Sequence, residues 1–392
     1  MSQMRRGGLV KMKWTGGIRK GNDMNQKTPG YHARGGANKQ DRELMTVMVI
    51  ALSLLILLLC LFVPIAMRRA QEAAEAWEKN PAKDTVQTDE KEADKTKTDE
   101  NPVADTAQTE DTAVGGELPI GNYISVTTTN TAIIAESAID AKYAILVDLT
   151  SGEAVAQRLA DDRIYPASMT KIMTILVAVE ELTAAELETT FTMTAEIVNA
   201  AIAEGASRAG FEPGERVKLS DLLYGAALPS GADATAALAQ YVAGSEEKYV
   251  ELMNEKARRL GLTATHFVNA SGLHHEDHYS TVREIAALMA YAMENETCRK
   301  LLSAASYTTA STDAHPYGIT LYSTTFSRMS KTVYGPVSVI AGKTGYTEEA
   351  RFCLVSLATR PDGREYVLVT VGGSSKYAPA ADCDAVYGTY LF

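Results

Sequence analysis

Three short segments of this sequence carry hydroxyl and ammonium side chains of the kind used in nucleophilic catalysis. The first is Ser168-Met169-Thr170-Lys171, which follows Pro166 and opens an apolar helical run. A lysine three residues after a serine lies on the same helix face, within reach of the hydroxyl. Desolvation by the apolar helix would lower the pKa of this lysine, so that it could act as a base. The segment therefore predicts a serine nucleophile beside its base.

The other two segments carry residues suited to holding a peptide. Lys343-Thr344-Gly345 follows a predicted strand, and such a triplet arises by chance in well under about a fifth of chains this long. An edge strand offers its backbone to an extended peptide, a cation and a hydroxyl can hold a carboxylate, and glycine leaves room for substrate. Ser230 lies in a loop between two predicted helices, from which its hydroxyl can relay a proton to a leaving amine.

Taken in order, these segments resemble the three motifs of the penicillin-binding protein and serine β-lactamase superfamily. More narrowly, the chain is similar to the low-molecular-weight D-alanyl-D-alanine carboxypeptidases. That resemblance covers residues 141–392 and rests on PASMTKIMT at 166–174, THFVNASGL at 265–273 and HYST at 278–281. It implies a β-lactamase/transpeptidase-like fold and a serine-type D,D-peptidase that uses no cofactor and no metal.

The resemblance also assigns the nucleophilic half of the site. Ser168 would be acylated by the penultimate D-Ala carbonyl of a peptidoglycan stem peptide that ends in D-Ala-D-Ala. Lys171 would take the proton of Ser168, and Ser230 with Lys343 would assist proton transfer. β-Lactams would be covalent inhibitors at the same serine.

The substrate-binding half would come from residues 343–346. Thr344 would bind the terminal carboxylate beside Lys343 and Gly345. The backbone N–H groups of Ser168 and Tyr346 would form the oxyanion hole for the tetrahedral intermediate.

One position departs from the family pattern. The middle motif is usually Ser-x-Asn, and here the third position is Ala232. The missing amide would normally hold substrate and orient the lysine, so its loss could lower the rate. A carboxypeptidase leads, and two alternatives stay open: a catalytically weakened binder of cell-wall peptide or β-lactam, and a β-lactamase.

Other segments with reactive side chains have simpler interpretations. Ser245, in a second Ser-x-x-Lys, is expected to cap a helix. The run from His274 to His278 lacks the spacing of a metal site and is expected to be a solvated loop. Cys353 and Cys383 could form a disulfide, but inert buried thiols are favoured.

Hydrophobic spacing predicts an α+β fold, with an antiparallel sheet built from both ends of the domain around a helical insert. Strands are expected at 144–148, 153–156, 337–340, 352–357 and 366–371. Helices are expected at 169–182, 219–228, 232–242, 246–260 and 282–294, with a closing helix from about Pro379.

The chain before this domain has three parts of contrasting composition. Residues 1–43 are basic and predict a disordered cytoplasmic tail, whereas residues 68–122 are acidic and predict a disordered linker. Residues 44–67 contain no charge and are long enough to span a membrane, with a cleaved signal peptide as the alternative.

The positive-inside rule then gives a single-pass membrane protein with a cytoplasmic N-terminus and an extracellular catalytic domain at 123–392. The formal net charge of −11 argues against a nucleic-acid partner.

Overall fold

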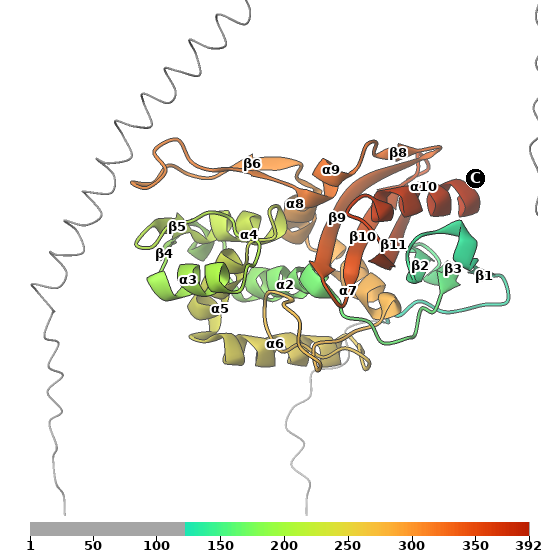
Figure 1. The fold of residues 1–392 in the computed structure, drawn as a ribbon, viewed down its shortest axis with the longest axis horizontal. Helices are drawn as coiled ribbons and strands as arrows, with labels where there is room; N and C mark the ends of the chain where they lie inside the picture. The colour runs from blue at the N-terminus through green and yellow to red at the C-terminus, as the bar shows by residue number, and fades with distance from the viewer. Residues whose placement is uncertain (1–121, 392) are drawn as a thin grey trace, which may run out of the picture. The chain divides into compact units, whose positions relative to one another are not determined.

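Strands from both ends of the domain form one seven-stranded sheet. The computed structural model describes residues 122–391 (Figure 1). The strand order is β1-β3-β2-β11-β10-β9-β8. The strands are β1 (Ala132–Ile133), β2 (Tyr143–Asp148), β3 (Glu153–Arg158), β8 (Val333–Tyr334), β9 (Val337–Thr347), β10 (Arg351–Thr359) and β11 (Glu365–Gly373).

The first and last hairpins of the domain meet in the middle of this sheet. Strand β2 pairs antiparallel with β11, and Val147 lies opposite Val367. The neighbouring pairs are also antiparallel, except for the parallel pairing of β1 with β3. The predicted α+β fold, with a sheet assembled from both chain ends, is confirmed.

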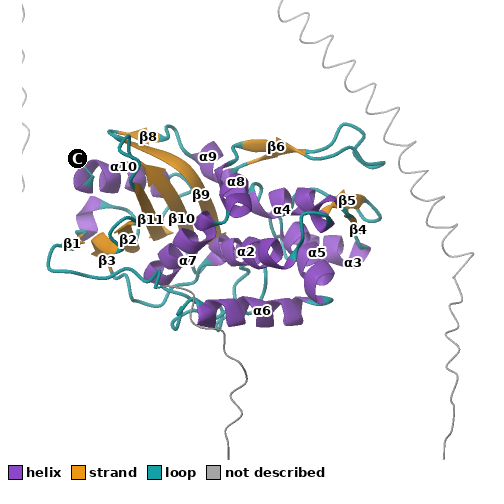
Figure 2. Cartoon of the chain, turned by 180° about the vertical axis from the view of Figure 1, so that it is seen from behind, coloured by secondary structure: helices purple, strands orange, loops and turns teal. Residues whose placement is uncertain are grey.

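The central strands bury both of their faces. Val355 and Val367 point into one hydrophobic core, whereas Leu354 and Leu368 point into another on the opposite face. Helix α7 (Val282–Glu294) covers the first face and α10 (Ala378–Tyr390) covers the second (Figure 2). This double coverage explains why these strands read as continuous apolar runs rather than as alternating ones.

Helix α2 (Lys171–Glu181) is the centre of the helical part. Its residues from Lys171 to Ala178 are all buried, as expected of a helix that is packed on every side. The helices that pack near it are α7, α4 (Leu219–Ala227), α5 (Ala232–Ala243), α6 (Glu246–Arg259) and α8 (Glu296–Ser303). Because α2 is fixed by this packing, the residues at its N-terminus are held rigidly.

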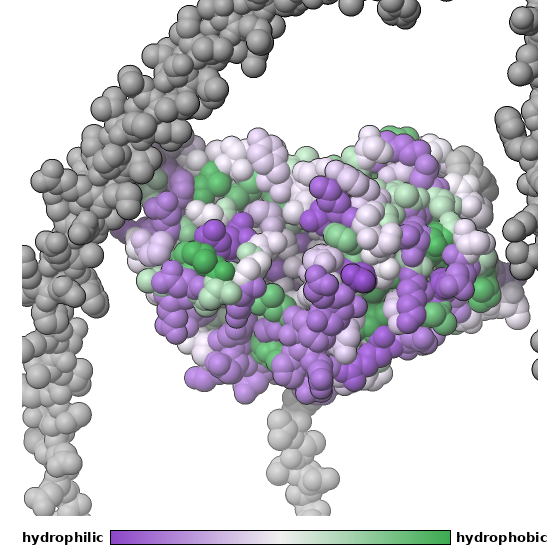
Figure 3. All heavy atoms as spheres, in the orientation of Figure 1, coloured by the Kyte–Doolittle hydropathy of each residue, from purple (hydrophilic) through white to green (hydrophobic). Residues whose placement is uncertain are grey.

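Smaller elements complete the domain. They are α3 (Ala195–Ala203), α9 (Thr324–Arg328), the hairpin of β4 (Thr190–Thr192) with β5 (Arg216–Lys218), and the hairpin of β6 (Ser306–Thr308) with β7 (Thr320–Tyr322). Hydrophilic side chains dominate the lower part of the face shown in Figure 3, over α6. Within residues 122–391, no helix combines the length and hydropathy needed to cross a membrane. The predicted span at 44–67 lies outside the described residues, as do the tail and nearly all of the linker.

The structure decides three smaller predictions that were made from the sequence. Ser245 caps α6 by accepting a hydrogen bond from the backbone N–H of Lys248, as predicted. Cys353 and Cys383 are free buried thiols, so the alternative of a disulfide between them is wrong. The prediction of a solvated loop at 274–278 is wrong for His278, which is only 2% exposed. Its ring packs beneath the nucleophile segment instead.

Candidate active site

Ser168 and Lys171 lie at the junction of a short turn with helix α2. Ser168 belongs to a 3-10 turn at Ala167–Thr170, and Lys171 is the first residue of α2. The Nζ of Lys171 is 3.0 Å from the Oγ of Ser168 and also donates a hydrogen bond to the carbonyl of Ser271. Burial lowers the pKa of Lys171 to about 7, although Asp233 and Glu246 partly oppose the shift. A substantial fraction of this amine is therefore unprotonated at neutral pH and can accept a proton.

The backbone is strained beside both candidate hydroxyls. Ala167, which precedes Ser168, has φ +47°, and Ser230 has φ +67°. Left-handed conformations in non-glycine residues cost about 1–3 kcal/mol each and persist only where the surrounding structure enforces them. Both residues thus hold conformations that tertiary packing imposes.

The loop at 265–281 supports the nucleophile from below. The Oγ1 of Thr174 donates to the carbonyl of Ala270 at 2.6 Å, which fastens the loop to α2. Gly272 has φ +80°, and a Cβ there would lie 2.0 Å from the carbonyl oxygen of Ala167. Only glycine can approach the turn this closely, which explains its place in the Asn-Ala-Ser-Gly segment.

His278 links the same loop to the nucleophile segment. Its Nε2 is 2.8 Å from the Oγ1 of Thr170, and its Nδ1 accepts from the backbone N–H of Val268 at 3.2 Å. Burial lowers the pKa of His278 to about 3, so the ring is neutral and Nε2 carries the proton. The histidine therefore positions Thr170, and both of its ring nitrogens have partners within the protein.

Lys343 reaches the site from strand β9 through Ser230. Its Nζ donates to the Oγ of Ser230 at 2.8 Å and to the carbonyl of Thr344 at 3.0 Å. Lys343 is fully buried, and burial lowers its pKa well below the usual value, with further lowering from the charges of Lys171 and Arg328. Ser230 thus lies next to a second amine of lowered basicity, as proton relay requires.

Strand β9 runs directly against the nucleophile turn. A Cβ at Gly345 would lie 3.1 Å from the backbone nitrogen of Ser168, from the Cβ of Ala167 and from the carbonyl of Pro166. The glycine therefore allows the strand to approach the turn. Ser168 and Tyr346, whose N–H groups are the predicted oxyanion donors, both line the cavity beside this contact.

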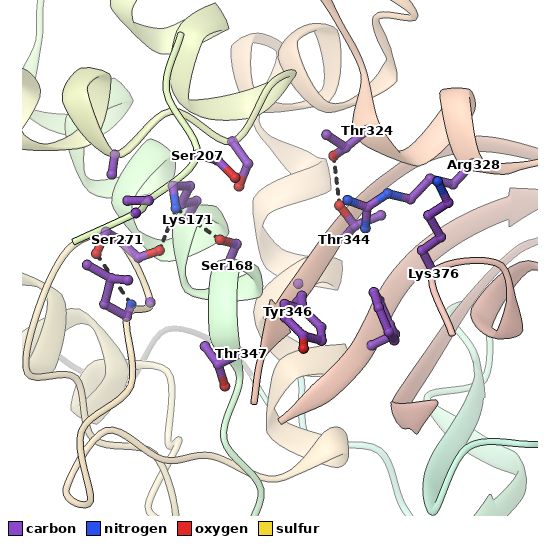
Figure 4. Close-up of a pocket in the computed structure, with 18 residues that line it drawn as sticks. Ser168, Lys171, Ser207, Ser271, Thr324, Arg328, Thr344, Tyr346, Thr347 and Lys376 are labelled. Atoms are coloured by element: carbon purple, nitrogen blue, oxygen red, sulfur yellow. Dashed lines mark hydrogen bonds between the residues drawn. The ribbon is translucent and has the colours of Figure 1, made fainter. Parts of the chain in front are cut away.

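These residues surround a cavity of about 260 Å³, shown in Figure 4. The predicted residues that line it are Ser168, Lys171, Ser230, Thr344, Gly345 and Tyr346. Lys343 does not line the cavity and contacts it through Ser230. The structure thus brings the sequence-predicted residues together, while their chemical roles stay predictions.

The cavity also has lining residues that the sequence did not reveal. Arg328 and Lys376 lie with Thr344 on one side of the cavity, and Ser207 lies beside Lys171 (Figure 4). The hydroxyl of Thr344 is 2.7 Å from that of Thr324. Two cations beside a hydroxyl form a binding place for a carboxylate. Arg328 and Lys376 belong to no local motif, so no sequence signal identified them.

Ala232, which replaces the usual asparagine, leaves the surrounding segment ordered. It begins helix α5, lines the cavity and donates its backbone N–H to the carbonyl of Ser207 at 2.7 Å. The buried carboxylate of Asp233 accepts from the backbone N–H groups of Ala209 and Gly210 at 2.8 and 3.1 Å. The motif is therefore firmly attached to the loop beside it.

Comparison with known proteins identifies the family of this chain. A family model described as D-alanyl-D-alanine carboxypeptidase, Peptidase S11, matches residues 127–375. The chain belongs to this family. Among its S11 relatives, the D-alanyl-D-alanine carboxypeptidase DacF of Bacillus subtilis is 34% identical over 238 residues, covering 60% of this chain and 58% of DacF. The chain thus spans less than two thirds of the length of that relative.

Other S11 relatives and solved structures agree. DacC of Escherichia coli is 40% identical over 154 residues, which are 38% of each chain. The crystal structure of the DD-transpeptidase of Streptomyces K15 is similar with a TM-score of 0.58 and 30% identity, over 65% of this chain and 99% of that one. A D-alanyl-D-alanine carboxypeptidase of Mycobacterium tuberculosis gives a TM-score of 0.57 at 28% identity, over 67% and 94% of the two chains.

Proposed function

We propose that this S11 family member is a serine-type D-Ala-D-Ala carboxypeptidase that trims peptidoglycan stem peptides through an acyl-enzyme on Ser168. The observation that carries the proposal is the contact of 3.0 Å between the Nζ of Lys171 and the Oγ of Ser168. The lysine there has a pKa of about 7, so it can act as a base at physiological pH.

Acylation begins with a peptide lying along β9. The carboxylate of its terminal D-Ala is held by Thr344 with Arg328 and Lys376, all of which line the cavity. Unprotonated Lys171 accepts the Ser168 proton as Oγ attacks the penultimate D-Ala carbonyl. The N–H groups of Ser168 and Tyr346 stabilise the resulting oxyanion.

Breakdown of the tetrahedral intermediate releases the terminal D-Ala. Its amine takes up the proton that Lys171 accepted from Ser168, relayed through Ser230, whose hydroxyl accepts a hydrogen bond from Lys343. A water molecule then attacks the acyl-enzyme, and Ser168 regains its proton as the shortened peptide leaves. A β-lactam enters the same path, because its ring carbonyl is attacked in place of the peptide bond, and remains attached as a slowly released ester.

Release of D-Ala from a synthetic stem peptide tests this activity. The wild-type protein should release D-Ala, the Ser168→Ala variant should not, and Ser151→Ala should match wild type because Ser151 is exposed in the β2–β3 turn. Equal release by wild type and Ser168→Ala would refute the proposed nucleophile.

The absence of an asparagine at position 232 favours a second candidate, a binding protein with weakened catalysis. Ala232 lines the cavity but offers no side-chain hydrogen bond to a substrate. Such a protein would bind the stem peptide and release no D-Ala, so the same assay distinguishes the two candidates. A β-lactamase would instead turn over β-lactams rapidly.

The proposed setting is the outer face of a cell membrane. Residues 44–67 would span it once, with the N-terminus cytoplasmic and residues 68–122 linking the span to the catalytic domain. The uncharged composition of 44–67 and the basic residues before it support this topology. Protease added outside intact cells should cleave the catalytic domain; protection of that domain would refute the orientation.

A further inference from the structure

Ser207 lines the catalytic cavity from the loop between α3 and β5, outside the three segments that the sequence singles out. It lies beside Lys171 in Figure 4, and its side chain is exposed in the open cavity. Within residues 122–391, no group forms a hydrogen bond with its hydroxyl, since the recorded hydrogen bond of this residue uses the backbone carbonyl. A hydroxyl in this state can donate a hydrogen bond to a molecule bound in the cavity.

The segment at 230–233 holds Ser207 in place. The carbonyl of Ser207 accepts a hydrogen bond from the backbone N–H of Ala232 at 2.7 Å. Two residues further on, the backbone N–H of Ala209 donates to the buried carboxylate of Asp233 at 2.8 Å. A Cβ at Gly231 would lie 2.7 Å from the backbone nitrogen of Ala209, so only glycine allows the loop to come this close. Ser207 is therefore fixed by the middle motif itself.

Ala232 leaves a donor missing at the same part of the cavity wall. Its methyl group lines the cavity but cannot form the hydrogen bond that the usual asparagine offers to substrate. The backbone hydrogen bond between the two residues places Ser207 next to this gap. The Nζ of Lys171 already contacts Ser168 and Ser271, so the hydroxyl of Ser207 is not occupied in holding the lysine.

A bound substrate presents a carbonyl on this side of the cavity. Figure 4 shows Arg328 and Lys376 on one side of Ser168, with Lys171 and Ser207 away from them. A peptide whose terminal carboxylate is held by the two cations therefore extends its acyl part toward Lys171 and Ser207. The amide carbonyl that precedes the penultimate D-Ala belongs to this part, and it needs a donor when it leaves water.

We propose that Ser207 is a substrate-positioning residue that takes over the role of the missing asparagine amide. Its hydroxyl donates to the amide carbonyl that precedes the penultimate D-Ala, and it donates to the corresponding side-chain amide carbonyl of a penicillin. The inference rests on the carboxypeptidase function proposed above. It assigns the donor to a loop that is attached to the middle motif rather than to the motif's third position.

Two β-lactams that differ at this carbonyl test the role of Ser207. Benzylpenicillin carries the side-chain amide, whereas 6-aminopenicillanic acid has the same ring system without the acyl group. In the full-length protein, Ser207→Ala should slow acylation by benzylpenicillin about three- to tenfold, as expected for one lost hydrogen bond. Acylation by 6-aminopenicillanic acid should change less than about twofold. Competition with a fluorescent penicillin measures both rate constants.

Two control variants show whether the hydroxyl itself is responsible. Ser207→Thr keeps the hydroxyl and should retain the preference of wild type for benzylpenicillin. Arg208→Ala changes the next residue of the loop, which is exposed and does not line the cavity, and should leave both rate constants unchanged. The pH at which acylation is half-maximal should stay the same in Ser207→Ala, because Lys171 keeps its contacts with Ser168 and Ser271.

Restoring the asparagine tests the replacement. With Ala232→Asn in place, the added Ser207→Ala substitution should slow acylation by benzylpenicillin less than about twofold, because the amide then supplies a donor. If the second substitution slows acylation as much as it does in wild type, the two positions do not share one role and the inference is wrong.

The outcomes separate this inference from the proposed function. Equal slowing of the two β-lactams in Ser207→Ala, or no slowing of either, would overturn the role of Ser207 and leave the carboxypeptidase intact. A shift of the pH midpoint would also overturn it, since Ser207 would then act through Lys171. A wild-type protein that forms no adduct with either compound would overturn the proposed function together with this inference.

Discussion

Replacing Lys171 by methionine should abolish acylation and yet stabilise the fold at neutral pH. Burial lowers the pKa of Lys171 from 10.5 to about 7. This shift means that burial destabilises the ammonium form, relative to the neutral amine, by on the order of 5 kcal/mol. Methionine fills a similar volume without that cost. It leaves the carbonyl of Ser271 without its hydrogen bond from Lys171, which costs about 1–3 kcal/mol. The net expected gain at pH 7 is on the order of 2 kcal/mol.

The gain should depend on pH in a defined direction. The folded protein loses the Lys171 proton near pH 7, whereas the unfolded chain keeps it up to its usual value of 10.5. Between these values the unfolded state binds more protons, so the stability of wild type rises with pH relative to the variant. The advantage of Lys171→Met should therefore shrink by on the order of 3 kcal/mol between pH 6 and pH 9.5.

Urea unfolding of both proteins at these two pH values measures the effect. A matched control is Lys300→Met, which replaces an exposed lysine on α8 and should show no comparable pH-dependent difference. If Lys171→Met were less stable than wild type at pH 6, or if its advantage did not change with pH, the idea of a lysine held near neutrality by burial would be refuted.

Three further substitutions have defined expected outcomes. Gly272→Ala should destabilise the protein by about 2–4 kcal/mol in thermal unfolding, because its Cβ meets the carbonyl of Ala167. Gly152 has a similar φ of +71°, but a Cβ there would have no atom within 4 Å. An equally large loss of stability in Gly152→Ala would therefore show that backbone strain alone is responsible. Ala232→Asn should preserve or raise the rate of acylation by a β-lactam, and a clear loss would mean that this site uses a different arrangement. Lys376→Met should raise the KM for a D-Ala-D-Ala peptide by about tenfold and leave a C-terminally amidated peptide unaffected, since only the first offers a carboxylate; equal effects on the two would argue against carboxylate binding.

The motif residues could be predicted because their types and spacing reflect local chemistry. Ser168 and Lys171 are three residues apart, so their contact follows from the turn and helix they occupy. The contact between Ser230 and Lys343 required the family resemblance, because 113 residues separate them and only the folded sheet brings them together.

Other features depend on packing that no short segment specifies. The helix predicted from Met169 begins at Lys171, since the preceding residues form a 3-10 turn whose Ala167 is held at positive φ by tertiary contacts. Helix α3 was not predicted because its apolar positions are mostly alanines, which leave a weak periodic signal. Arg328 and Lys376 reach the cavity from the end of α9 and from the segment after β11, and their convergence exists only in three dimensions.

Labelling of the full-length protein with a fluorescent penicillin tests the central claim most directly. Wild type should carry a signal that survives denaturation, and the signal should be absent in Ser168→Ala. The labelling rate should rise with pH through about 7, as Lys171 loses its proton. Labelling that persists in Ser168→Ala, or a wild-type protein that forms no covalent adduct, would contradict the assignment of Ser168 as an active nucleophile.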